Sequence, residues 1–296
     1  GARVALQLQT GARPPRRTVL TVREVRELDV TSAPLPGVKG GWLIKVQKFA
    51  PGGEDRLAAA LNVAAGAERW PRAILLDLRG NGGGVFPVAL AMLAQLTGGA
   101  FATVVTTRDG SAEMPIKARE GGALLPQTSS IVVLIDIGCG SACELVAAAL
   151  RHHRGALVVG GRSYGKATLQ DGLPLTTAAG RVLVTIGHFS TPGGAPIHGR
   201  GVTPDVSLSA ARRFGQRQED QAFVLRLPDA GAPSASVAIA PLQRCVATLP
   251  PPTGRRRQPL QADATPAQLA VDEPVVQDAI GWLRCVASGP ALARRR

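Results

Sequence analysis

The stretch Ala73-Ile-Leu-Leu-Asp-Leu-Arg-Gly-Asn-Gly-Gly-Gly84 decides the fold class of this 296-residue chain. Its first six residues form a short, almost continuous apolar run, which is typical of a strand buried on both faces of a parallel sheet. The glycines that follow indicate a tight turn, and Val85–Leu96 has the pattern of a helix. This order of strand, glycine turn and helix predicts one repeating unit of an α/β domain.

The same order recurs downstream. Ile131–Ile137 is a second apolar run that ends in glycine, Ser141–His152 follows as a predicted helix, and Ala156–Val159 is a third apolar run. We therefore expect an α/β core with a mostly parallel sheet. In such sheets binding sites gather where the strands end and the helices begin, which is where both glycine-rich turns lie.

Upstream of the decisive stretch, Trp42–Phe49 is a predicted strand. Residues 53–70 predict an amphipathic helix whose apolar positions are Leu57, Ala60, Leu61 and Val63. At the front of the chain, residues 3–10 and 18–23 predict a hairpin of half-buried strands. The remaining segments are expected to be a connection (28–40), β-structure with turns (Thr168–Val206), long loops (207–269) and a short terminal helix (Asp272–Cys285).

Composition excludes several classes of protein. The 45% hydrophobic content excludes a chain that is disordered throughout, and no apolar run reaches the roughly 18–20 residues that a membrane span needs. The formal charge of +13 (34 Lys+Arg against 21 Asp+Glu) comes almost entirely from arginine, in clusters within predicted loops and tails. Nucleic-acid binding favours basic faces with interleaved aromatics, and aromatics are 3% of this chain, so no nucleic-acid partner is expected.

The four cysteines and four histidines lack the spacing of metal ligands, so we expect neither a zinc site nor a cofactor. Cys139 and Cys143 bracket Ser141. Cys245 and Cys285 form a disulfide if the compartment is oxidising, and two buried free thiols are the alternative.

Ser141 is the first candidate for chemistry. It lies in Gly138-Cys-Gly-Ser-Ala-Cys-Glu144, between an apolar strand and the start of a predicted helix. That place exposes a serine hydroxyl and directs helix N–H groups toward a developing oxyanion. The alternative is a serine that only caps the helix, with Glu144 three residues later completing a capping box.

Lys166 is the candidate base. It is one of only five lysines, and no histidine is well placed in the sequence for that role. Lysines act as bases where burial lowers the pKa of the ammonium from ~10.4 toward ~7–8. If residues 166–170 are extended, Gln170 projects on the same face as Lys166 and orients it without adding charge. The alternative is an exposed lysine that follows a tight turn.

The glycines of the decisive stretch are the third candidate. Their amides suit an oxyanion or a phosphate, but the lysine pattern of a phosphate-binding loop is absent, which disfavours phosphate. A tight turn between strand and helix, with no further role, is the alternative.

Together these three segments resemble the carboxyl-terminal processing peptidases, also called tail-specific proteases. That family shows a D-L-R-x-N-x-G-G turn, a serine followed three residues later by Glu, and a lysine in a G-K-x-x-x-Q run 25 residues after the serine. Here Lys166 follows Ser141 by 25 residues and Gln170 lies four beyond Lys166. Gly199–Val206 is similar to the family's G-[IV]-x-P-D-V motif, and the resemblance runs from Trp42 to Val206.

The resemblance implies a serine endopeptidase that cleaves proteins near their C-terminal end. Ser141 is then the nucleophile, Lys166 the general base and Gln170 the residue that positions the lysine. An oxyanion hole would come from the amides of Ala142 and of Gly83 or Gly84, and Glu144 and Ser163 would support the site. Three small replacements depart from the family pattern: Gly82 for Pro, Cys143 for Ser and Ala167 for Gly.

The resemblance also implies a crotonase-like core with a PDZ domain before it. Residues 1–27 are then the last strands of a PDZ domain, 28–206 the catalytic core, and 207–296 an extension rich in Pro and Arg. Implied partners are protein substrates with apolar C-terminal tails in a bacterial cell envelope, with peripheral membrane association and homo-oligomerisation left open. A catalytically silent member of the fold that binds peptides or other ligands is the alternative.

Overall fold

The computed structural model describes residues 2–9, 11, 14–22, 28–65, 70–118, 123–176, 180–208, 239–249 and 273–288. A six-stranded sheet in the order β12-β9-β8-β5-β4-β3 lies at its centre. All neighbours from β4 to β12 pair in parallel, and only β3 at the edge is antiparallel. The prediction of an α/β core with a mostly parallel sheet is therefore confirmed. The strands are β3 (Val30–Pro34), β4 (Gly41–Val46), β5 (Ala73–Asp77), β8 (Ser130–Ile135), β9 (Leu157–Gly160) and β12 (Val206–Ser207).

Side chains of the central strands alternate between two hydrophobic cores, one on each face of the sheet. In β5, Ile74 and Leu76 enter the first core, whereas Ala73 and Leu75 enter the second. A strand with both faces covered has no polar side, which explains why the decisive stretch is a continuous apolar run.

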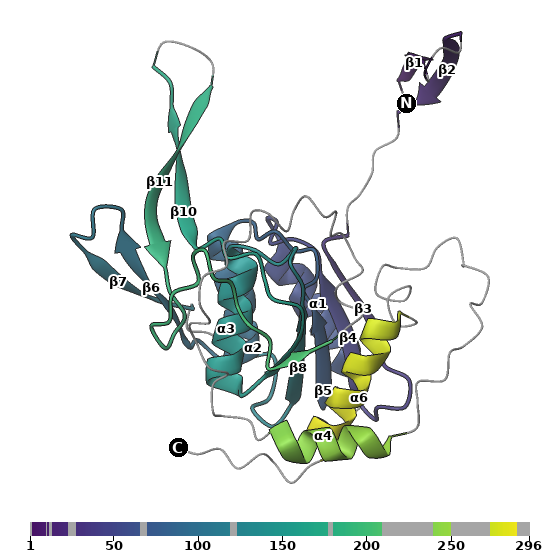
Figure 1. Ribbon diagram of the computed structural model, residues 1–296, viewed down its shortest axis with the longest axis vertical. Helices are drawn as coiled ribbons and strands as arrows, with labels where there is room; N and C mark the ends of the chain where they lie inside the picture. The colour runs from purple at the N-terminus through teal and green to yellow at the C-terminus, as the bar shows by residue number, and fades with distance from the viewer. Residues whose placement is uncertain are drawn as a thin grey trace.

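Helices cover both faces of this sheet and make three layers (Figure 1). On one face lie α1 (Gly53–Ala65), α2 (Phe86–Thr97) and α3 (Ala142–Arg154). On the other lie α4 (Ile239–Thr248) and α6 (Pro274–Ser288). Residues 142–150 of α3 are all buried, so this part of the helix that follows the candidate serine is enclosed on every side, whereas His152 in the last turn is exposed.

Three sequence predictions about the elements of the three-layer core need correction. The apolar face of α1 uses Leu57, Ala60, Leu61 and Ala64, whereas Val63 is 65% exposed, because helical spacing from Leu57 returns at residue 64. Residues 28–40 contain the edge strand β3 and are not only a connection. Residues 207–269 contain helix α4, which packs against α6, and residues 209–238 and 250–269 of that segment lie outside the described part of the chain.

A second, four-stranded antiparallel sheet has the order β10-β11-β6-β7. Figure 1 shows its two hairpins projecting from the same side of the three-layer core. The β-structure predicted after Thr168 is confirmed, but its two partner strands were not predicted. The bounds are β6 (Phe101–Thr107), β7 (Glu113–Lys117), β10 (Thr168–Pro174) and β11 (Arg181–Phe189).

At the front of the chain, β1 (Arg3–Leu8) and β2 (Arg16–Thr21) form the predicted antiparallel hairpin as a sheet of their own. The strands are exposed on both faces and not half-buried as predicted, since Leu8 and Leu20 are each about half exposed. Among the described helices, none has the length and apolar character needed to cross a membrane.

Candidate active site

Three turns meet at the carboxyl ends of neighbouring parallel strands, because β5, β8 and β9 are adjacent in the sheet. The glycine-rich turn follows β5, the turn that holds Ser141 follows β8, and the segment that leads to Lys166 follows β9. The structure thus brings together the three segments that the sequence singled out.

Ser141 has an unusual backbone. Its φ of 58° and ψ of −125° make it the only non-glycine residue with a positive φ among the described residues. The capping box that the sequence offered as the alternative, formed by Ser141 with Glu144, is present. A serine whose only role is to cap a helix typically has an extended backbone, so the conformation of Ser141 indicates a constraint beyond capping. Strained backbone of this kind concentrates at functional sites, where the surrounding structure holds it in place.

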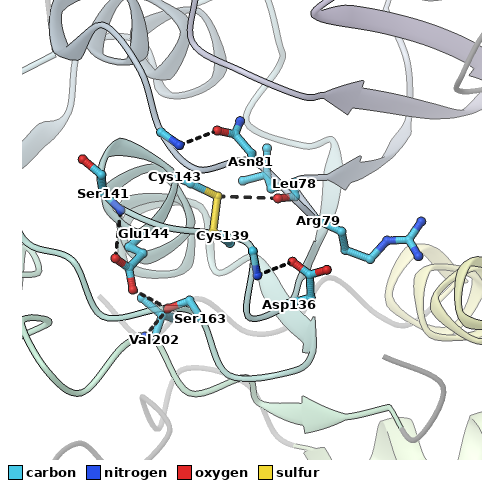
Figure 2. The surroundings of a disulfide bond; sticks show 12 residues. Leu78, Arg79, Asn81, Asp136, Cys139, Ser141, Cys143, Glu144, Ser163 and Val202 are labelled. Atoms are coloured by element: carbon cyan, nitrogen blue, oxygen red, sulfur yellow. Dashed lines mark hydrogen bonds between the residues drawn. A yellow bond between two sulfur atoms is a disulfide. The ribbon is translucent and has the colours of Figure 1, made fainter. Parts of the chain in front are cut away.

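Glu144, in the first turn of α3, is the carboxylate that joins the serine to the lysine. Its Oε2 accepts the backbone amide of Ser141 at 2.9 Å and that of Lys166 at 2.8 Å. Its Oε1 accepts the Ser163 hydroxyl at 2.5 Å and the Gly165 amide at 2.6 Å. Burial raises the pKa of Glu144, although these four hydrogen bonds oppose the shift. The predicted supporting pair, Glu144 and Ser163, is therefore in direct contact (Figure 2).

Lys166 donates from its Nζ to Gln170 Oε1 at 3.2 Å, as predicted. The sequence predicted this contact from an extended segment over residues 166–170, in which the two side chains would lie on the same face. In the structure β10 begins only at Thr168, and an irregularity between Leu169 and Gln170 breaks the alternation of side chains along the strand. In the part of the chain that the structure describes, the Ser141 hydroxyl and the Lys166 ammonium are not hydrogen-bonded to each other. What connects the two residues is Glu144.

The glycine-rich turn lies against the nucleophile candidate. A Cβ on Gly83 would stand 2.8 Å from Ser141 Cβ and 3.2 Å from the Ala142 nitrogen. The Gly83 amide donates to Asn81 Oδ1 at 2.8 Å, so of the predicted oxyanion donors it is the one already engaged. Ala142 is the first residue of α3, where a helix leaves its amide without an intrahelical partner.

Two buried polar residues, to which the sequence assigned no role, hold these turns together. Asn81 donates through its side chain to the Val46 carbonyl at 3.0 Å, and its own carbonyl accepts the Gly140 amide at 3.0 Å. Asp136 Oδ1 accepts the amides of Gly80 at 2.8 Å and Gly138 at 3.0 Å, and burial raises the pKa of this carboxyl. In the sequence, Asp136 interrupts an apolar run and Asn81 lies in the glycine-rich turn, and neither feature reveals these contacts.

Both cysteine pairs are bridged. The Cys245–Cys285 disulfide, which the sequence left open, joins α4 to α6. The Cys139–Cys143 disulfide, which was not predicted, closes around Ser141 (Figure 2). Within the described ranges, His, Cys, Asp and Glu side chains do not gather in threes as a metal site needs.

A buried charge network adjoins the site. Asp77, at the end of β5, accepts hydrogen bonds from Arg79 Nη2 at 2.7 Å and from Lys45 Nζ at 3.2 Å. Burial by itself would raise the pKa of Asp77, but the Arg79 hydrogen bonds and charge outweigh it and lower the pKa. The Arg79 side chain turns away from the disulfide (Figure 2) and donates from Nη1 to Glu273 beside α6 at 2.7 Å.

The model of peptidase family S41 matches residues 42–208. The chain is 33% identical over 135 residues to the chloroplastic C-terminal processing peptidase of Tetradesmus obliquus, covering 46% of this chain and 28% of that protein. It is 30% identical over 217 residues to the chloroplastic carboxyl-terminal-processing peptidase 2 of Arabidopsis thaliana, covering 70% of this chain and 40% of that protein. The chain thus spans less than half the length of these two relatives.

Among solved structures, the photosystem II D1 C-terminal processing protease has a similar fold. The TM-score is 0.55 at 24% identity, and the alignment covers 74% of this chain and 57% of the other. This likeness supports the fold and adds nothing on the chemistry.

Proposed function

The chain belongs to peptidase family S41, and from that premise we propose that it is a serine endopeptidase that cleaves proteins near their C-terminal end. In this proposal Ser141 is the nucleophile and Lys166 the general base. The observation that carries it is the Glu144 carboxylate, one oxygen of which holds the backbone of both residues while Ser141 keeps a strained conformation.

The proposed reaction begins when a neutral Lys166 amine takes the proton of the Ser141 hydroxyl as its oxygen attacks the scissile carbonyl carbon. The carbonyl oxygen becomes an oxyanion, to which the amides of Ala142 and Gly84 donate hydrogen bonds. The Lys166 ammonium then protonates the leaving amine, which departs and leaves an acyl ester on Ser141. Lys166 next activates a water molecule, which hydrolyses that ester.

Two features of Lys166 support this role. Lys166 as a residue is half-buried, and its amine donates at the surface to Gln170, a neutral side chain that orients the nitrogen without adding charge. Catalytic hydrogen bonds are often long or absent before substrate binds and tighten in the complex. The proposal therefore places the contact between Ser141 and Lys166 in the substrate complex.

The proposed substrates are proteins with apolar C-terminal tails, and the proposed location is a bacterial cell envelope. Two bridged cysteine pairs support an oxidising compartment of this kind. We also propose that the hairpin β1–β2 belongs to a PDZ domain. A lone two-stranded hairpin is marginally stable in water, and the exposed apolar side chains of these strands would gain from the further strands of such a domain.

The test is cleavage of an unstructured protein that ends in a free apolar C-terminus, followed by mass spectrometry. We expect Ser141→Ala and Lys166→Ala each to lower the rate about a thousandfold or more. The matched controls are Ser111→Ala and Lys117→Ala, exposed residues of the β6–β7 hairpin, which should keep the rate of the unaltered chain. Full activity of Lys166→Ala would overturn the dyad, and cleavage that survives Ser141→Ala would overturn the nucleophile. Binding of the substrate without turnover would favour the catalytically silent alternative.

A further inference from the structure

The Cys139–Cys143 disulfide encloses the proposed nucleophile. Cys139 lies in the turn after β8 and Cys143 in the first turn of α3, with their Cα atoms 5.5 Å apart and Ser141 midway between them. Both cysteines are fully buried. In Figure 2 Ser141 and Glu144 lie on one side of the bridge, and Leu78 and Asn81 lie on the other.

The enclosed turn is held from two directions. The Gly140 amide donates to the Asn81 carbonyl at 3.0 Å, and the Cys139 carbonyl accepts the Tyr164 amide at 2.8 Å. These bonds tie the turn to the glycine-rich segment on one side and to the segment that leads to Lys166 on the other. Cys143 Sγ also lies 3.7 Å from the Leu78 carbonyl oxygen, a contact and not a hydrogen bond because a bridged sulfur carries no proton.

The restraint of this turn matters because Ser141 has a strained backbone conformation. A non-glycine residue with a φ of 58° persists only where its surroundings over-determine it. The disulfide joins Cys139 to Cys143, two residues before and two residues after Ser141. It therefore restrains the backbone torsions of Ser141, which would otherwise relax from this conformation. The hydrogen bond from the Ser141 amide to Glu144 fixes one end of that turn, and the disulfide fixes its span.

The second disulfide provides the contrast. Cys245 and Cys285 are 40 residues apart in the sequence, whereas Cys139 and Cys143 are four apart. The chain entropy that a bridge removes from the unfolded state grows with the length of the loop it closes. The long bridge therefore contributes more to the stability of the whole chain, and the short one acts on the geometry of its own turn.

We propose that the Cys139–Cys143 disulfide is a positioning device that keeps Ser141 in its reactive backbone conformation. The inference rests on the proposed function, since it assumes that Ser141 is a nucleophile. The two cysteines act through Ser141 and have no contact with substrate of their own. Without the bridge, the turn samples conformations in which the hydroxyl is misplaced, and reaction slows without loss of the fold.

The experiment measures how fast Ser141 attacks a fluorophosphonate probe, in which the serine oxygen bonds to phosphorus, fluoride leaves and the hydroxyl proton passes to the base. Rate against probe concentration separates the limiting rate of reaction from the affinity for the probe. The test variant is Cys139→Ala with Cys143→Ala, and the matched control is Cys245→Ala with Cys285→Ala. Thermal unfolding is followed for each, and alkylation under denaturing conditions counts the free thiols of the unaltered chain.

We expect the test variant to lose about tenfold or more in limiting rate with little change in probe affinity, since a small misplacement of a reacting group has effects of this size. Its segment 138–145 should also exchange amide hydrogen faster in mass spectrometry. The control should keep the limiting rate while its unfolding midpoint falls. If the alanine pair does not fold, the pair Cys139→Ser with Cys143→Ser takes its place.

Three results would overturn the inference. One is a limiting rate in the test variant within about twofold of the unaltered chain. Another is the presence of free thiols at Cys139 and Cys143, and a third is failure of both variants to fold, which would make the bridge a requirement of the fold and not of the nucleophile. If the unaltered chain never reacts with the probe at Ser141, both the proposed function and this inference are overturned. That outcome is distinct from failure of this inference alone, because it is seen in the unaltered chain and not in a variant.

Discussion

In the candidate site, Gly83 packs directly against Ser141. Gly83 has a φ of +101°, and a side chain there would meet Ser141 Cβ at 2.8 Å and the Gly140 carbonyl at 2.9 Å. Gly80 in the same turn has a φ of +71°, but a Cβ on it would meet nothing within 4 Å. The two positions share the backbone requirement for glycine and differ only in what lies beside them.

This difference makes a matched pair of variants. Gly80→Ala should lower the free energy of unfolding by about 1–2 kcal/mol, the cost of a left-handed backbone for an L-residue. Gly83→Ala should lower it by more, because its Cβ would also stand within 3.0 Å of Ser141 Cβ and of the Gly140 carbonyl oxygen. Only Gly83→Ala should displace Ser141, so we expect it to lower the peptidase rate about a hundredfold while Gly80→Ala stays within about threefold. Urea denaturation measures the loss of stability. The rate of cleavage of a protein with a free apolar C-terminus measures the loss of activity. Equal losses of activity would show that packing against Ser141 is unimportant.

At the residue scale, sequence spacing selected candidate residues but revealed few of their contacts. The intervals that join Ser141, Lys166 and Gln170 were enough to select them, and Gln170 does meet Lys166. The Cys139–Cys143 bridge was missed, although the cysteines were seen to bracket the serine, because a spacing of four does not reveal whether two sulfurs face each other. The roles of Asn81 and Asp136 were missed because Val46 and Gly80, to which they are hydrogen-bonded, are distant from them in the sequence.

At the scale of elements, Glu144 fastens the start of α3 to the segment that precedes β10. Replacing it with glutamine puts an NH2 group where a carboxylate oxygen now faces two donors. Each donor left without an acceptor costs about 1–3 kcal/mol of stability. We expect Glu144→Gln to lower kcat about ten- to a hundredfold with KM nearly unchanged. Glu113→Gln, on exposed β7, is the control and should match the unaltered chain.

The pH profile should report the same carboxylate. Burial raises the pKa of Glu144, so it takes up a proton at a higher pH than an ordinary glutamate and then loses one of its hydrogen bonds. Because the pKa is higher in the folded chain than in the unfolded one, this proton stabilises the fold: the contribution is fully present below the unfolded pKa and is lost as pH rises through the folded value. Activity should therefore decline on acidification while circular dichroism stays constant. The Glu144→Gln variant, which has no carboxyl group to titrate at this position, should lack this part of the decline, and an unchanged profile in that variant would contradict the role of Glu144.

Elements were predictable where burial made the sequence distinctive. The strands β5, β8 and β9 are apolar on both faces and were recognised, and so were the helices between them. The edge strand β3 has a partner on one side only and ends at Pro34, so a segment rich in Pro, Gly and Ser concealed it. Helix α4 has a proline in its first turn and follows a loop-like composition, and its packing against α6 is what makes it a helix.

At the scale of the whole molecule, one buried arginine links the site to the distant end of the chain. Arg79 joins Asp77 at the end of β5 to Glu273 beside α6, 194 residues away in the sequence. The helix that covers the second face of the sheet is thereby fixed to the same turn that packs against Ser141. The D-L-R motif was recognised from sequence, but the partner of its arginine was not, because Glu273 lies beyond Trp42–Val206, in a part of the chain where the resemblance is only loose.

Removing this arginine should therefore act on stability in a pH-dependent way. Arg79→Gln leaves Asp77 buried with only Lys45 as a charged partner, and breaking a buried pair costs about 3–5 kcal/mol. Arg79 lowers the pKa of Asp77, so its contribution is present above the ordinary carboxyl pKa of ~3.9 and is lost as pH falls through the lowered value. In the variant, Asp77 avoids the cost of a buried charge by taking up a proton. The difference in the free energy of unfolding between the unaltered chain and the variant should therefore be largest near neutral pH and decrease as pH falls toward 4.

Urea denaturation of both chains at several pH values measures this gap in stability, with the exposed Arg181→Gln as control. A gap of constant size would mean that Arg79 acts through its packing and its bond to Glu273, and that the charge of Asp77 does not set the stability of the sheet.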